Sequence, residues 1–309
     1  MHQLIKNSIV LGGRQGLKSG FSLLCIMVPI SLLVALLNWT GLLGIISNAI
    51  SPAFRYFGLP GSAALSFVTG TLLNCYSAIA IMITLPLTPR EITILSLMVL
   101  FSHNLPLEAS VQKKTGSSAL FMVLYRLGTA IAGGICMNLL LPGKAAFSAG
   151  AGQAASTAAF AVPFMSMLLT WAHGSLSLIV KVMLIIMGLM ILNRFLKESG
   201  AAHHLSRILA PVLKLFGLSE EAGFLFIVAN TLGLAYGGGV MLAEKEEGRI
   251  SDQGIRELNV FVATCHSLLE DTLLFIAIGA SGFWIIVPRL VVGGGAVWVY
   301  RAVTSKKQE

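Results

Sequence analysis

Two histidines, each followed five residues later by an acid, stand in strongly apolar stretches of this chain. The first pair is His103 and Glu108, and the second pair, 163 positions further on, is His266 and Asp271. A neutral imidazole beside a carboxylate can ligate a metal, carry a proton or donate a hydrogen bond to a substrate. Ionisable side chains are costly to place inside a bilayer, so their duplication predicts a functional site.

Two arginines repeat with the same spacing, Arg126 and Arg289, each roughly nine residues inside an apolar run. A central arginine costs at least about 2.5 kcal/mol on membrane-insertion scales, so each needs a carboxylate, backbone carbonyls or water. Glu108 and Asp271 are the candidate carboxylates. Two interpretations remain open: an ion pair that holds two helices in register, or a counter-charge that orients or gates a transport site.

The segments that carry the histidines contain signals for interrupted helices. Pro106 removes a backbone hydrogen bond shortly after His103, and a broken helix leaves free carbonyl and amide groups from which transporters build sites. In a continuous second segment, His266 would share a face with Glu270, four residues on. The candidate residues for binding a substrate or a coupling ion are His103, Asn104, Glu108, His266, Ser267, Glu270, Asp271, Asn74 and Asn230.

Asn74 and Asn230 come from a second pair of polar-rich apolar segments, 70–77 and 230–239. The second of these ends in three consecutive glycines, which lower helical stability and permit a close approach of backbones. Tight helix packing through small residues is one interpretation. A discontinuous helix that lines the permeation path is the other.

The four cysteines are far apart and form no CxxC pair, so a disulfide framework is not expected. Cys25 and Cys136 are interpreted as small apolar residues. Cys75 and Cys265 lie in segments interrupted by polar residues. They extend the donor set for an alternative divalent metal site, because Fe²⁺ and Zn²⁺ accept sulfur, imidazole and carboxylate ligands. That set is Cys75, His103, Glu108, Cys265, His266 and Asp271.

The composition predicts an all-α integral membrane protein. Hydrophobic residues make up 56% of the chain and charged residues 11%, whereas soluble domains carry about 25% charged residues. The net charge of +8 is spread over loops and ends, which suits anionic headgroups and excludes a nucleic-acid partner. We expect a multi-pass protein of the bacterial cytoplasmic (inner) membrane. No catalytic motif is present, and an enzyme is not expected.

The apolar segments predict two homologous four-span repeats with broken helices at mid-membrane. One additional crossing between them, within an Ala/Gly/Ser-rich linker, would invert the second repeat. The chain would then cross the membrane nine times instead of eight. The Lys/Arg distribution does not decide between the two orientations, and inversion is the arrangement we expect. The predicted divisions are an N-terminal interfacial segment 1–20, a first repeat 21–141, the linker 142–174, a second repeat 175–303 and a polar tail 304–309.

A Pro-x-x-x-x-x-Gly-Leu motif at 52–59 recurs at 211–218, and segments rich in small and polar residues follow at 61–82 and 221–241. With these motifs the chain resembles the Gate-domain, or nucleoside-recognition-domain, family of membrane proteins. It is similar in this respect to the spore maturation A/B proteins and to the membrane part of ferrous iron transporter B. The resemblance covers both halves and implies nucleosides by the family name or a metal by the iron transporter, whose GTPase domain this chain lacks.

Together these features predict a membrane transporter or permease that moves a small polar or ionic solute through a site between two repeats. The alternatives are a divalent metal ion pathway and a non-transporting membrane subunit of a larger complex. No cofactor is required; the candidate residues are compatible with a divalent metal or with a coupling ion, either a proton or sodium. The expected partners are the lipid bilayer, the solute, and a second copy of the chain or a membrane partner protein.

Overall fold

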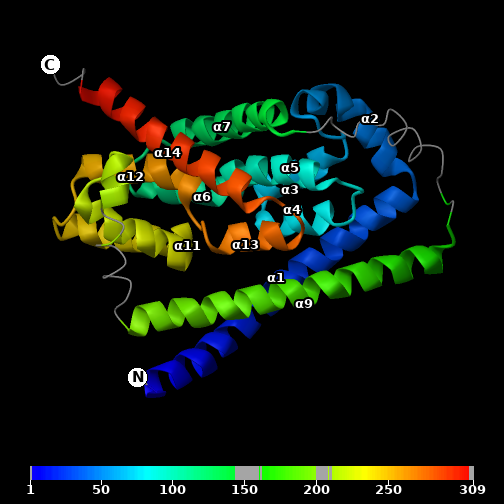
Figure 1. Ribbon diagram of the computed structural model, residues 1–309, viewed down its shortest axis with the longest axis horizontal. Helices are drawn as coiled ribbons and strands as arrows, with labels where there is room; N and C mark the ends of the chain where they lie inside the picture. The colour runs from blue at the N-terminus through cyan, green and yellow to red at the C-terminus, as the bar shows by residue number, and fades with distance from the viewer. Residues whose placement is uncertain (1, 143–159, 161, 200–207, 209–210, 306–309) are drawn as a thin grey trace.

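The computed structural model describes residues 2–142, 160, 162–199, 208 and 211–305, and within them the chain is helical, without β-strands (Figure 1). The helices are α1 (His2–Trp39), α2 (Leu42–Phe54), the 3₁₀ turn η1 (Arg55–Phe57), α3 (Ala63–Leu72), α4 (Cys75–Met82), α5 (Pro89–Ser102), α6 (Leu105–Lys114), α7 (Ala119–Leu140), α9 (Phe164–Glu198), α11 (Glu220–Glu246), α12 (Asp252–Cys265), α13 (Glu270–Ala277) and α14 (Gly282–Ser305).

Six helical segments of the described chain are long and apolar enough to cross a membrane. Three lie in each half: α1, α5–α6 and α7, and then α9, α12–α13 and α14. The sequence predicted eight or nine crossings. That number counts the apolar segments at about 61–85 and 220–243 as spans, whereas in the structure both fold back on themselves.

The helices α3 and α4 form a hairpin in place of a crossing. Asn74 adopts an extended conformation between them, and its side chain accepts a hydrogen bond from the amide of Ser77, which caps α4. The hydroxyl of Ser66 on α3 donates to the carbonyl of Ala78 on α4 at 2.9 Å, so the two helices lie side by side. With 10 and 8 residues, neither helix alone reaches across a hydrocarbon core of about 30 Å.

Helix α11 folds back in the same way. Gly233 has φ 79° and ψ 161°, a conformation open to glycine alone. A Cβ atom on Gly237 would lie 3.1 Å from the Cα of Ala229, whereas residues eight apart in a straight helix are about 12 Å apart. The chain therefore turns at Gly233. The three consecutive glycines at 237–239, where the sequence predicts a weakened helix, are not the turning point. Gly233 follows Asn74 by 159 positions, the offset of the upstream motifs.

The long helices α1 and α9 cross the molecule as an antiparallel pair (Figure 1). Gly12 faces Ile191 and Gly16 faces Met187, because the absence of side chains on these glycines lets the backbones approach. Helix α1 merges the interfacial segment 1–20 with the first span. Helix α9 likewise merges the end of the linker 142–174 with the following span.

Parts of four predicted segments lie outside the described residues. They are residue 1 of the N-terminal segment, residues 143–159 and 161 of the linker, residues 200–207, 209 and 210 of the second repeat, and residues 306–309 of the tail.

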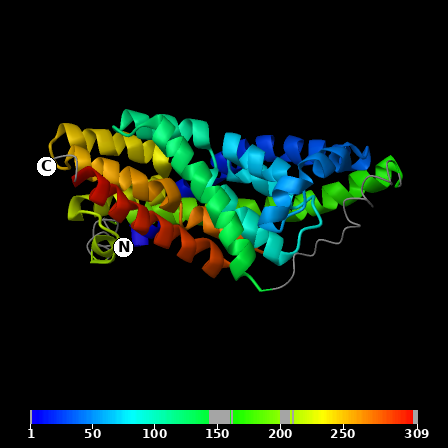
Figure 2. The same ribbon diagram turned by 90° about the horizontal axis from the view of Figure 1, so that it is seen from above.

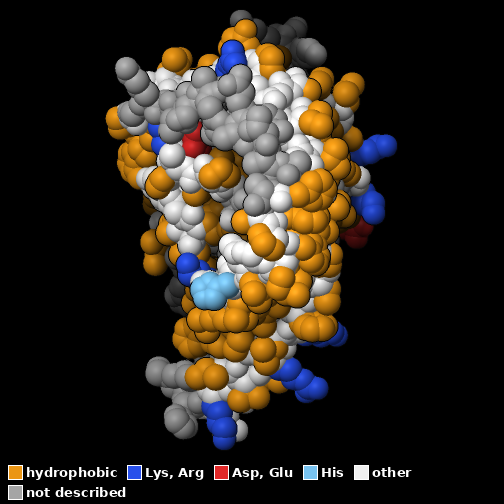
Figure 3. Space-filling model, turned by 90° about the vertical axis from the view of Figure 1, so that its right-hand side faces the viewer, with side chains coloured by type: hydrophobic (Ala, Val, Ile, Leu, Met, Phe, Trp, Pro, Cys, Tyr) orange, Lys and Arg blue, Asp and Glu red, His pale blue; other side chains and the backbone are white. Residues whose placement is uncertain are grey.

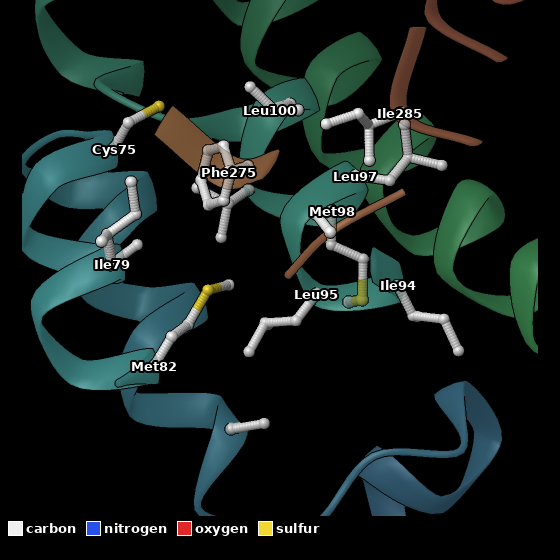
Figure 4. Packing of buried hydrophobic residues seen from close by; sticks show 14 of the residues in the cluster. Cys75, Ile79, Met82, Ile94, Leu95, Leu97, Met98, Leu100, Phe275 and Ile285 are labelled. Carbon is white, nitrogen blue, oxygen red and sulfur yellow. The ribbon is translucent and has the colours of Figure 1, made fainter. Parts of the chain in front are cut away.

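The helices α5 and α12 form the centre of the molecule. Every residue from Thr93 to Ser102 of α5 is buried, and so is every residue from Glu257 to Cys265 of α12. Leu95 of α5 lies in one apolar cluster with Met82 of α4 and Phe275 of α13 (Figure 4). Apolar side chains also cover much of the outer surface (Figure 3), as a lipid-facing surface requires.

The α1–α9 contact gives a test of the fold. Changing Gly16 to alanine places a Cβ atom 2.8 Å from the Cα of Met187, and overpacking of this kind costs about 1–3 kcal/mol. We expect a lower Tm of the detergent-purified protein in a thermal unfolding experiment. The neighbouring Gly13→Ala is the matched control: its Cβ meets no atom within 4 Å, so the Tm should be unchanged or slightly higher. Equal effects of the two changes would contradict the close approach of α1 and α9.

Candidate functional site

Two broken helices place the two histidines face to face. His103 follows the last residue of α5, and His266 follows the last residue of α12. The segments α5–α6 and α12–α13 run in opposite directions along the long axis of the molecule (Figures 1 and 2), so their breaks meet near its middle. The Nε2 atoms of His103 and His266 are 3.0 Å apart, at the contact between the two halves of the chain.

Each break has the same backbone form. Asn104 and Ser267 adopt left-handed conformations with φ of 51° and 49°, which is uncommon for residues other than glycine. The second break forms without a proline, so His266 and Glu270 are not on one continuous helix and the face-sharing expected for them is wrong. The break persists there because other groups of the protein bind the backbone atoms that it frees.

Two arginines bind those freed carbonyls. Arg126 donates from Nε to the carbonyl of Phe101 at 2.9 Å and from Nη2 to the carbonyl of His103 at 2.8 Å. Arg289 makes the equivalent bonds, from Nε to the carbonyl of Thr264 at 2.7 Å and from Nη2 to the carbonyl of His266. Both guanidinium groups are fully buried. The arginines therefore fix the ends of α5 and α12 against α7 and α14.

The amide groups freed at the breaks are bound by the two hairpins. The side chain of Asn230 on α11 accepts a hydrogen bond from the amide of Leu268 at 2.9 Å. The carbonyl of Gly70 on α3 accepts one from the amide of Asn104 at 3.0 Å. Asn230 thus positions the second break, while Asn74 caps α4.

Acids from both halves complete the cluster. Glu108 Oε1 lies 3.1 Å from His266 Nε2 and 3.4 Å from His103 Nε2. Asp271 Oδ2 lies 3.5 Å from His103 Nε2. Each histidine therefore contacts the acid of the other half, and no more than 5% of any of these four residues is exposed. Glu108 also pairs with Arg126, with 2.6 Å between Oε2 and Nη1.

The tautomer of His266 follows from its contacts. Its Nδ1 atom lies 2.7 Å from the carbonyl of Val262, and a carbonyl only accepts hydrogen bonds, so Nδ1 carries the hydrogen. In the neutral ring, Nε2 then presents a lone pair, which can accept a hydrogen bond from Nε2 of His103 but not from the Glu108 carboxylate. This is the state in which an imidazole binds a metal ion or accepts a proton.

The tip of the α3–α4 hairpin adds a thiol. The ligand atoms of Cys75, His103 and Asp271 lie within 4.8 Å of one another, as do those of His103, Glu108 and His266. The thiol of Cys265 instead donates to the carbonyl of Arg289 at 2.9 Å.

Both ligand groups could hold a metal ion. Ligands about 2.0–2.1 Å from a tetrahedral metal are about 3.3–3.4 Å apart, close to the distances of 3.0 to 3.5 Å between the histidine and carboxylate atoms.

Some contributors were not identified from the sequence. The Tyr76 hydroxyl donates to Glu270, which leaves Glu270 bound at the edge of the cluster. Asn259 on α12 donates to the hydroxyls of Thr115 and Ser117, both at 2.9 Å, and so joins the two halves through a buried polar contact. Tyr76 and Asn259 are polar residues within apolar segments, and this was the signal that could have identified them. The backbone carbonyls that Arg126 and Arg289 bind have no signature in the sequence.

The fold and the cluster define a helical membrane protein with an ionisable site at its centre. Residues 20–129 match the Gate family, described as nucleoside recognition. The chain is also 32% identical over 275 residues to the uncharacterized membrane protein YvoD of Bacillus subtilis (strain 168), which covers 89% of this chain and 88% of that protein. No solved structure matches significantly. This chain belongs to the Gate, or nucleoside-recognition, family of membrane proteins.

The ion pair between Arg126 and Glu108 generates a testable prediction. Removing one partner leaves an uncompensated buried charge, which typically costs about 3–5 kcal/mol. We expect both Glu108→Gln and Arg126→Gln to lower the Tm strongly. The double variant should recover part of that loss, because it leaves neither charge behind. Thermal unfolding of the four proteins measures this coupling. Strictly additive losses would show that the pair does not contribute to stability.

Proposed function

We propose that this protein is a transporter of the bacterial cytoplasmic membrane that moves a small polar or ionic solute through the cluster at its centre. One observation carries the proposal: two interrupted helices, one from each half, bring two histidines and two acids together in a buried position. A stable core gains nothing from four such side chains in apolar surroundings. Interrupted helices at mid-depth are the usual source of solute sites in secondary transporters.

We infer that the halves are inverted repeats. Three membrane-length segments and one folded-back hairpin in each half give an odd number of crossings, so the second half would enter the membrane from the opposite side. The opposed directions of α5–α6 and α12–α13 support this interpretation. So do the equivalent arginine bonds, whose partners are 25 and 23 residues away in both halves.

A cavity supports an access route from one side. It has a volume of about 720 Å³ and lies between α1, α2, α9 and the end of the α3–α4 hairpin, where Trp39, Thr84 and Trp171 line it. Helix α4 connects the cavity to the cluster. Cys75 of the cluster is its first residue, and Ile83, which lines the cavity, follows its last residue. Such a cavity suits a vestibule on the side of the first half.

A divalent metal ion is the second candidate solute. The observation that favours it is the spacing of the His103, Glu108 and His266 ligand atoms, which suits one ion with nitrogen and oxygen ligands. The thiol of Cys75 would add a softer ligand next to this group.

Flux through reconstituted protein tests the transport proposal. In proteoliposomes, a panel of divalent metals, nucleosides and amino acids should include one solute that enters faster than in empty vesicles. Asp271→Asn should reduce that flux at least about tenfold, because it removes a buried acid of the site. Asp252→Asn, which changes an exposed acid, is the matched control and should keep the flux. Equal flux in both variants would contradict the role of the cluster. No flux from folded protein would favour a membrane subunit of a larger complex.

Thermal stabilisation separates the metal from the other solutes. A metal that binds the folded state raises the Tm by mass action, and we expect this for Zn²⁺ or Cd²⁺ at micromolar concentration. The shift should disappear in His103→Ala/His266→Ala. Cys75→Ser should reduce the response to Cd²⁺ more than the response to Zn²⁺, whereas Cys136→Ser, at an exposed position, should change neither. A metal-induced shift that persists without both histidines would exclude this metal site.

A further inference from the structure

The two halves match in backbone but differ in their ion pairs. In the first half, Arg126 Nη1 contacts Glu108 at 2.6 Å. In the second half, Arg289 Nη1 is buried and has no hydrogen-bond or ion-pair partner among the residues that the structure describes. The acid at the equivalent position, Asp271, lies beside His103 instead. One ion pair is therefore closed and the other is open.

The acids of the two pairs differ by a single methylene group. Both guanidinium groups are held by equivalent pairs of backbone carbonyls, so their positions in the two halves correspond. The acids also occupy equivalent positions, 163 residues apart. Glutamate is one methylene longer than aspartate: Glu108 reaches its arginine, whereas Asp271 makes no such contact within the described part of the chain.

Arg289 keeps its two hydrogen bonds to backbone carbonyls but has no carboxylate partner, and a buried charge without such a partner is costly. In an inverted-repeat transporter, the two halves exchange conformations when access changes sides. We propose that the pairs Arg126–Glu108 and Arg289–Asp271 close alternately. The first pair is closed while the cavity beside α4 is open, and the second is closed when access is from the opposite side. The Glu/Asp difference sets the resting side.

This exchange keeps the charge of the site constant. One acid is always neutralised by its own arginine, and the other stays available to the solute. In the present structure the available acid is Asp271, which shares a ligand group with Cys75 and His103. After the exchange it is Glu108, which already lies 3.1 Å from His266. Access can therefore change sides without leaving the cluster with an additional unpaired acid.

Double-mutant cycles on thermal stability test the pairing without any solute. In the parent protein, Glu108→Gln and Arg126→Gln should be strongly non-additive in Tm, whereas Asp271→Asn and Arg289→Gln should be additive. The variant Glu108→Asp/Asp271→Glu exchanges the two acids between the halves. In this exchanged background, the non-additivity should be found between Arg289 and the acid at position 271. Strong coupling in the second pair of the parent would overturn the proposal. So would coupling that stays with the first pair in the exchanged background.

Labelling of the cavity tests the change of side. Thr84 lines the cavity, so Thr84→Cys should react with a water-soluble maleimide in the parent background. It should react several-fold more slowly in Glu108→Asp/Asp271→Glu, because the cavity closes. Each background without Thr84→Cys serves as the blank for the native thiols. Unchanged labelling in a folded exchanged variant would overturn the proposal.

The inference rests on the proposed transport function, but the two can fail separately. The cycles and the labelling report on protein conformation alone, whereas the flux assay reports on the solute. If no solute is transported but the cycles and the labelling give the expected results, transport of the tested solutes is rejected. The alternate closing of the two ion pairs is then retained. If a solute is transported but the cycles and the labelling fail, the alternate closing of the ion pairs is rejected and transport is retained.

Discussion

The architecture depends on one constraint: backbone groups freed at a broken helix must find partners, because lipid supplies none. Arg126 and Arg289 meet this constraint for the carbonyls that precede each break. The two hairpins supply acceptors for the amides that follow. Once these partners are present, the histidines at the ends of α5 and α12 can meet at the centre.

The repeated side chains were the part of the site that could be predicted from sequence. His103 and His266 stood out because polar residues in apolar segments are rare, and their equal spacing related them to Arg126 and Arg289. Cys75 was grouped with them, and the structure places it against His103 and Asp271. Cys265 was grouped on the same grounds, yet its thiol is bound to a backbone carbonyl. Residue type alone cannot distinguish these two environments.

The crossings were harder to predict, because hydropathy records how apolar a segment is and not where it turns. The stretches at 61–85 and 220–243 have the length of a span, but Asn74 and Gly233 reverse the chain within them. The three consecutive glycines at 237–239 predicted an interruption of the helix at the wrong position. The reversal at Gly233 depends on one backbone conformation, and the one feature of the sequence that marks this glycine is its position 159 residues after Asn74.

The inverted repeats that we propose would explain why the cluster contains two different acids. Equal halves would favour neither side, so the resting state must come from a residue at which the halves differ. Among the paired ionisable residues of the cluster, the histidines and arginines are identical, and Glu108 and Asp271 differ by one methylene. A difference of this size leaves the charge of the cluster unchanged and alters only the reach of one carboxylate. The asymmetry needed for a resting side can therefore arise without disturbing the chemistry that both states share.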